Sequence, residues 1–126
     1  MRTIATAPRV EVFALPWPPS ANTSKIPVRG RMVSTPKLRA YHTACVLHLG
    51  TLDIPPMLPP YEVTLEFHEP DRRRRDVANL EKAVCDSIVK AGIMEDDCKI
   101  NKLTLVRMPE KLKDGRVVVT ITEVSA

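Results

Sequence analysis

Twelve prolines divide this chain of 126 residues into short segments and limit where a helix can form. Proline has no backbone N–H and biases the residue before it toward extended conformations, so helices rarely run through it. The segment Leu15-Pro16-Trp17-Pro18-Pro19-Ser20 is therefore predicted to be a rigid, extended exit from the element before it. Residues 51–60 contain four prolines and are predicted to form a loop.

Between these segments, alternating apolar residues predict strands. Such alternation occurs in residues 9–15 and again in Tyr61–Phe67, where the odd-numbered side chains share one face. Residues 102–108 and 116–123 are predicted as two further strands, joined by a turn at Asp114-Gly115. Residues 21–35 are polar and basic, which favours a loop or an irregular hairpin.

Two helices are predicted from capping signals and apolar spacing. Thr35-Pro36 supplies an N-cap and a proline at the first helical position, so a helix is expected to run from there to about Leu49 and to stop at Gly50. A second helix is expected over residues 77–91, where apolar residues form one stripe, and Gly92 should end it. The resulting order β-α-β-α-β-β predicts an α/β (α+β) fold with a mixed β-sheet covered by two helices, in one domain of residues 1–126.

Charge is unevenly distributed along the chain. The net charge is +4 and the pI is about 9.1, with basic residues concentrated in 25–39 and 72–75 and acids in 95–97. A clustered basic patch is typical of nucleic-acid binding, although a solvated basic face is the alternative. The three cysteines have no paired spacing, so neither a disulfide framework nor a zinc site is indicated. No apolar run suits a membrane span or a signal peptide, so we expect a cytoplasmic protein without a membrane partner.

The arginine run Arg72–Arg75 is the first candidate for binding. A guanidinium group can grip two phosphate oxygens at once, so these side chains are expected to contact the phosphates of a nucleic acid. The alternatives are a solvated loop or pairing with Asp71 and Glu69, although four cations exceed what two acids can neutralise. Lys25, Arg29 and Arg31 could form a second basic arm. Trp17 could stack on a base, but its proline-flanked position favours packing.

Acidic residues near this run are candidates for a metal site. Asp76 lies in the first turn of the second predicted helix, where it could bind a metal ion or only cap the helix. On a helical wheel, Asn79, Lys82 and Asp86 share one face. Asp97 follows the helix, but spacing alone leaves open whether it returns to Asp76. Lys82 could stabilise charge on a phosphate or could be a solvated lysine, and Glu95 and Asp96 are weaker candidates.

The chain resembles the RusA-type Holliday junction resolvases of bacteria and their prophages over almost its whole length. The resemblance rests on the motifs already described and on others further along, namely Leu15–Ser20, Pro70–Asp76, Asn79-Leu80, Lys82, Asp86, Lys90-Ala91-Gly92, Asp96-Asp97 and Thr120–Glu123. It implies a homodimeric endonuclease of the bacterial cytoplasm that binds four-way DNA junctions. It further implies symmetric nicks in two opposed strands, with Mg²⁺ or Mn²⁺ as cofactor. The DNA contacts expected on this basis are Arg72, Arg73, Arg74, Arg75, Asn79, Lys25, Arg29 and Arg31.

The resemblance also implies a catalytic set of three acids and a lysine. The acids that hold the metal fall on Asp76, position 78 and Asp97, and the lysine falls on Lys82. Position 78 is Ala78 in this chain, and an alanine can neither bind a cation nor accept a proton. We hypothesise that Ala78 is an engineered Asp→Ala change that leaves a binding-competent, inactive form. The alternatives are a natural variant and a naturally non-catalytic module that binds junctions or other nucleic acid.

Overall fold

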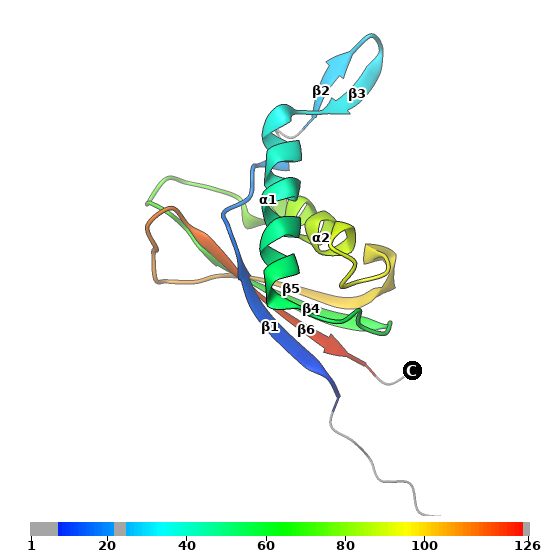
Figure 1. Cartoon of the computed structure of the whole chain (residues 1–126). Coiled ribbons are helices and arrows are strands. Elements are labelled where there is room, and N and C mark those ends of the chain that lie inside the picture. The colour runs from blue at the N-terminus through cyan, green and yellow to red at the C-terminus, as the bar shows by residue number, and fades with distance from the viewer. Residues whose placement is uncertain (1–7, 22–24, 125–126) are drawn as a thin grey trace, which may run out of the picture.

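The computed structural model describes residues 8–21 and 25–124, and a four-stranded sheet forms its base (Figure 1). The strands are β1 (Val10–Leu15), β4 (Tyr61–His68), β5 (Ile100–Arg107) and β6 (Arg116–Glu123), in the order β1-β6-β4-β5. Strand β4 pairs parallel with β5 and antiparallel with β6, and β1 pairs antiparallel with β6. The sheet is therefore mixed, as predicted, although β5 begins two residues before the predicted start.

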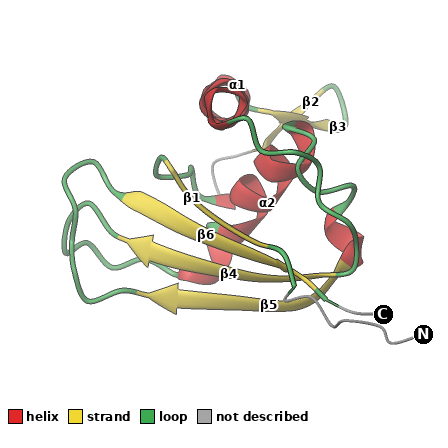
Figure 2. Ribbon diagram, turned by 60° about the horizontal axis from the view of Figure 1, so that its bottom comes forward, coloured by secondary structure: helices red, strands yellow, loops and turns green. Residues whose placement is uncertain are grey.

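Helices α1 (Pro36–Leu52) and α2 (Glu81–Lys90) cover the same face of this sheet (Figure 2). Alternate residues of the strands point toward them, because side chains on a strand change face at every residue. In β4, Tyr61, Val63, Leu65 and Phe67 are all at most 1% exposed. The core therefore lies between one sheet face and two helices.

A hairpin, one of the two alternatives for residues 21–35, is present in the structure. It consists of β2 (Lys25–Val28) and β3 (Arg31–Ser34), which pair antiparallel. Its turn has positive φ at both Arg29 (51°) and Gly30 (77°), which matches the twist of a two-residue hairpin. The predicted order β-α-β-α-β-β omitted these two strands. Figure 1 shows the hairpin projecting beyond the N-terminal end of α1.

The start of α1 is confirmed, and its predicted end is wrong. The Thr35 side chain accepts a hydrogen bond from the backbone N–H of Leu38 at 3.3 Å, with Pro36 in the first turn. The helix continues through Gly50 to Leu52 and ends at Asp53, whose φ of 54° is left-handed. An exposed glycine inside a helix costs only about 1 kcal/mol, so Gly50 does not force a stop.

The second predicted helix is divided into two parts. Val77–Asn79 form a short 3-10 turn (η2), and α2 begins only at Glu81. Gly92, with φ of 81°, follows the end of α2 as expected. A second 3-10 turn, η3 (Asp97–Lys99), leads directly into β5. Asp76 therefore precedes the short η2 turn rather than lying in the first turn of α2.

Across the described ranges, no helix is long and apolar enough to cross a membrane.

Candidate nucleic-acid interface

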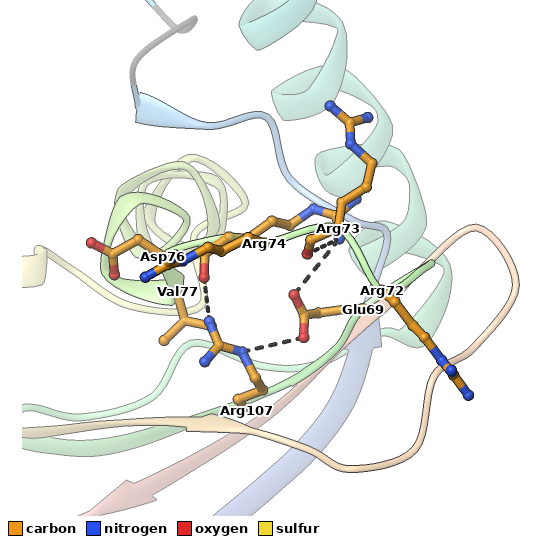
Figure 3. Close-up of a pocket in the computed structure, with 8 residues that line it drawn as sticks. Glu69, Arg72, Arg73, Arg74, Asp76, Val77 and Arg107 are labelled. Atoms are coloured by element: carbon orange, nitrogen blue, oxygen red, sulfur yellow. Dashed lines mark hydrogen bonds and ion pairs between the residues drawn. The ribbon is translucent and has the colours of Figure 1, made fainter.

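The four arginines surround a surface groove between the end of β4 and η2. Its lining residues are Glu69, Arg72, Arg73, Arg74, Arg75, Asp76, Val77 and Arg107, and its volume is about 720 Å³ (Figure 3). We call it the arginine groove. Figure 3 shows the side chains of Arg72 and Arg73 pointing to opposite sides of the loop. Bound phosphates could therefore be contacted on more than one side.

Glu69 is an acid in the floor of this basic groove. The residue is 4% exposed, and its Oε1 lies 3.2 Å from Nε of Arg107 and 3.1 Å from Nζ of Lys111. Its Oε2 lies 3.6 Å from Nη1 of Arg75. A buried carboxylate is tolerated only when it is paired, and three cations from different segments meet that need.

Arg75 differs from the other three arginines because its guanidinium is already engaged. Nη1 of Arg75 lies 2.9 Å from Oδ1 of Asp71, and its guanidinium carbon lies 5.6 Å from the centre of the Trp17 ring. The hydrogen bond between the two side chains lowers the pKa of Asp71 and raises the pKa of Arg75. Trp17 also contacts Phe67 edge to face, with ring centres 6.0 Å apart. The packing role favoured for Trp17 is therefore confirmed.

Arg72, Arg73 and Arg74 remain available for an anion. All three are exposed, and within the described residues their side chains form no ion pair. Arg73 and Arg74 also line a neighbouring groove of about 450 Å³, together with Lys37, Asn79 and the segment from Trp17 to Ser20. Asp76 lines both grooves, so the predicted contacts at Asn79 and in the arginine run share one surface with this acid.

Asp76 caps the η2 turn. Its Oδ1 accepts a hydrogen bond from the backbone N–H of Ala78 at 3.1 Å. The capping alternative is therefore realised, while Asp76 itself remains exposed. Figure 3 shows its side chain turned away from Glu69, on the far side of the groove.

Lys82 connects α2 to the turn that carries Asp97. Its Nζ lies 2.8 Å from Oδ2 of Asp97 and 3.2 Å from Oδ1 of Asp86. These contacts confirm that Lys82 and Asp86 share a helix face, and they bring Asp97 back to α2. The pKa of Lys82 is raised, chiefly by the hydrogen bond to Asp97, so its ammonium is charged at neutral pH. Although exposed, Lys82 is paired rather than merely solvated.

The other acids near this pair have local roles. Asp96 accepts a hydrogen bond from the backbone N–H of Cys98 at 3.0 Å, which starts η3 and lowers the pKa of Asp96. The backbone N–H of Glu95 donates to the hydroxyl of Tyr61 at 3.1 Å. Glu81 is partly buried, and desolvation raises its pKa. Asp96 therefore acts as a turn cap, which was one of the two alternatives for it.

The second basic arm is only partly brought to the same region. Lys25 lines a hollow of about 360 Å³ together with Lys82 and Asp86. Arg29 and Arg31 flank Gly30 at the turn of the hairpin. Sequence reasoning missed Arg107 and Lys111 as parts of the basic surface, and it did not single out Lys37 within the basic stretch 25–39. A lone basic residue at the end of a strand or in a loop, such as Arg107 or Lys111, carries no signal of where the fold will place it.

The residues present do not complete a metal site. Across residues 8–21 and 25–124, no group of three acid, histidine or cysteine side chains lies close enough together to hold a metal ion. Ala78 is exposed directly beside Asp76 and offers only a methyl group. The Oδ2 atom of Asp97 is occupied by the Lys82 ammonium. A divalent ion would need a further oxygen ligand near position 78.

The fold and the grooves define a small α+β protein with an arginine-rich, basic surface and a lysine–carboxylate pair on α2 and η3. Residues 16–122 match the family described as "Endodeoxyribonuclease RusA". The chain is 41% identical over 113 residues to the "Crossover junction endodeoxyribonuclease RusA" of Escherichia coli (strain K12) and to the corresponding protein of Enterobacteria phage 82. A Shigella sonnei relative of the same description is 40% identical. Each of these alignments covers 88% of this chain and 92% of the relative. This chain therefore belongs to the RusA family of endodeoxyribonucleases.

Proposed function

We propose that this chain binds four-way DNA junctions and that its fold is built to resolve them by paired, symmetric cleavage of two phosphodiester bonds. The observation that carries the proposal is the arginine groove, which places beside Asp76 three arginines that form no ion pair among the described residues. The description of the related proteins, crossover junction endodeoxyribonuclease, supports the choice of DNA and of junctions. Contacts from arginine to phosphate position a nucleic acid without reading its sequence, which suits selection by structure.

Catalysis is assigned to Asp76, Lys82, Asp97 and the acid that would stand at position 78. Three carboxylates there would hold a divalent cation, Mg²⁺ or Mn²⁺. When bound, such an ion activates water and neutralises charge that develops on the phosphate. Lys82 acts as a fixed cation beside the phosphate rather than as a base, because its pKa is raised by Asp97.

Ala78 should make this chain inactive without abolishing binding. The methyl group cannot replace a carboxylate ligand, whereas Arg72, Arg73 and Arg74 are unaffected by the change. A missing carboxylate also removes one negative charge beside the DNA phosphates, which favours binding. An engineered Asp→Ala change and a natural variant lead to the same expectation for this chain.

The proposal includes a two-fold homodimer that acts inside a bacterial cell. In a closed two-fold dimer each subunit presents the same surface, so each can cut one of two symmetry-related strands. Relatives in Escherichia coli and in a phage support a bacterial host and a phage or prophage source.

The test is cleavage of an end-labelled four-way junction in Mg²⁺ or Mn²⁺, with this chain and its Ala78→Asp variant compared directly. We expect paired symmetric nicks from the variant alone, and binding by both proteins. An Ala44→Asp variant adds the same charge to an exposed position of α1 and should remain inactive.

The second candidate is a naturally non-catalytic junction-binding module. It is favoured by the lack of a three-acid group in the described part of the chain. If neither this chain nor the Ala78→Asp variant cuts while both bind the junction, the catalytic assignment is wrong and the module is the better description.

A further inference from the structure

Glu69 places a negative charge in the basic groove that is proposed to bind DNA. It follows directly after β4, and its buried carboxylate lies beneath the arginine run. A negative charge there opposes the binding of phosphates. Yet the carboxylate is held by cations from three segments, namely Arg75 of the loop, Arg107 at the end of β5, and Lys111 between β5 and β6.

Arg107 links Glu69 to the backbone of the arginine run. Its Nε forms an ion pair with Oε1 of Glu69 at 3.2 Å, while its Nη2 donates a hydrogen bond to the carbonyl oxygen of Arg75. The dashed line between Arg107 and Glu69 in Figure 3 marks the first of these contacts. The Arg75 carbonyl directly precedes Asp76. Glu69 is therefore connected, through Arg107, to the backbone directly before Asp76, the acid that lines both grooves.

The guanidinium of Arg75 contacts both an aromatic ring and two carboxylates. It lies 5.6 Å from the centre of the Trp17 ring, and its Nη1 contacts both Glu69 (3.6 Å) and Asp71 (2.9 Å). Trp17 itself is closely packed, because a Cβ atom added at Gly115 would lie only 2.9 Å from its side chain. Arg75 consequently serves as part of the frame of the groove.

We propose that Glu69 is a positioning residue for DNA binding. By holding Arg75 and Arg107 in fixed places, its carboxylate sets the path of the loop so that Arg72, Arg73 and Arg74 face the DNA. The charge of Glu69 is neutralised by the cations it orders, so the groove remains basic. This proposal rests on the proposed function, because it concerns how the same surface binds a junction.

The test is a Glu69→Gln variant of this chain, measured for junction affinity and for tryptophan emission. Trp17 is the only tryptophan in the sequence, so its emission reports on the guanidinium beside it. If Glu69 only added negative charge, its removal would tighten binding. We expect Kd for the junction to rise instead, by roughly tenfold, because the neutral amide weakens the charge-assisted contacts that hold Arg75 and Arg107. We also expect the emission spectrum to shift toward that of an Arg75→Gln variant.

Glu66→Gln is the matched control. Glu66 lies in β4, which Glu69 directly follows, and has the same side chain, but it points to the sheet face opposite the core. We expect its Kd and emission to equal those of the unmodified chain. Unchanged emission together with equal or tighter junction binding by Glu69→Gln would overturn the proposal.

Two further results keep the outcome clear. If circular dichroism shows that Glu69→Gln does not fold, Arg107→Lys replaces it, since lysine keeps the charge but cannot bridge Glu69 and the Arg75 carbonyl with a planar fork. Binding by Arg107→Lys as tight as that of the unmodified chain would then contradict the role of Glu69. If the unmodified chain binds no junction, the proposed function fails, and emission alone decides whether Glu69 positions Arg75.

Discussion

Lys82 and Asp97 are joined by a hydrogen bond of 2.8 Å between Nζ and Oδ2, although they are separated by fifteen positions in the sequence. The bond connects α2 to η3 across the turn at Gly92. Lys82, the cation of the proposed catalytic set, therefore contacts Asp97, one of its acids. Asp86 accepts from the same ammonium at 3.2 Å, so Lys82 keeps an ionic partner even when Asp97 is otherwise engaged.

The first prediction concerns the charge on Lys82. In the Ala78→Asp background, Lys82→Met should lower the rate of junction cleavage by about 10²-fold, the cost of removing one electrostatic stabiliser. Junction binding should change little, because the arginine groove is intact. Lys90→Met removes an exposed lysine from the last turn of the same helix and should leave cleavage unchanged. Equal cleavage rates in the two lysine variants would show that Lys82 has no part in the reaction.

The second prediction concerns pH. Hydrogen bonding to Asp97 raises the pKa of Lys82, so the pairing stabilises the fold below the unfolded pKa of about 10.4. That contribution is lost only as pH rises through the higher folded value. We therefore expect no alkaline fall in cleavage from Lys82 below about pH 10.

The measurement is the pH–rate profile of the Ala78→Asp variant with and without Lys82→Arg, whose guanidinium stays charged throughout. The two profiles should have the same alkaline limb. A fall between about pH 8 and about pH 9.5 that disappears with arginine would mean that Lys82 titrates in this range.

The third prediction separates Arg75 from its neighbours. Replacing Arg72, Arg73 or Arg74 with glutamine should leave one DNA phosphate without its cation and reduce the slope of log K against log salt by about 0.9 for each such phosphate. Arg75→Gln should instead lower the free energy of unfolding, because it leaves the buried Glu69 with one cation fewer. Lys102→Gln, an exposed position on β5 outside both grooves, serves as the control for charge alone. A salt slope reduced equally by all five variants would indicate a diffuse basic surface.

Much of the sheet and its core could be predicted because each strand carries its own alternation. Tyr61–Phe67 is apolar at every second position, and the structure buries those positions. The division of the second helix could not be predicted in this way. Apolar residues three apart form the same stripe in a 3-10 turn as in an α-helix, so the stripe from Val77 to Leu80 conceals the break. The hairpin turn was also hidden, since Arg29 has positive φ without being glycine.

The sequence pointed to the arginine run and to its pairing with nearby acids, but not to the contacts made across the fold. Arg72–Arg75 and Asp76 are adjacent in sequence, so local reasoning brought them together correctly. The ion pairs of Glu69 with Arg107 and Lys111 cross from one strand to the end of another and to a loop. Such pairs depend on the parallel pairing of β4 with β5, which residue spacing does not encode. Residue spacing likewise does not show that Asp97 lies against Lys82.

The last prediction concerns the support of Trp17 by Gly115. Gly115 has φ of +72°, and an added Cβ atom would lie 2.9 Å from three atoms of the Trp17 side chain. Gly115→Ala should therefore lower the free energy of unfolding by about 1–3 kcal/mol, from backbone strain and from overpacking against the indole ring.

Gly30→Ala is the matched control, because Gly30 has a similar φ of +77° but no atom within 4 Å of an added Cβ. It should cost about 1 kcal/mol from the backbone alone. Denaturant unfolding of both variants, followed by the emission of Trp17, gives the difference between them. A cost for Gly115→Ala no greater than that for Gly30→Ala would mean that the indole moves freely. Arg75, which lies against Trp17, would then be held less firmly in the arginine groove than the structure indicates.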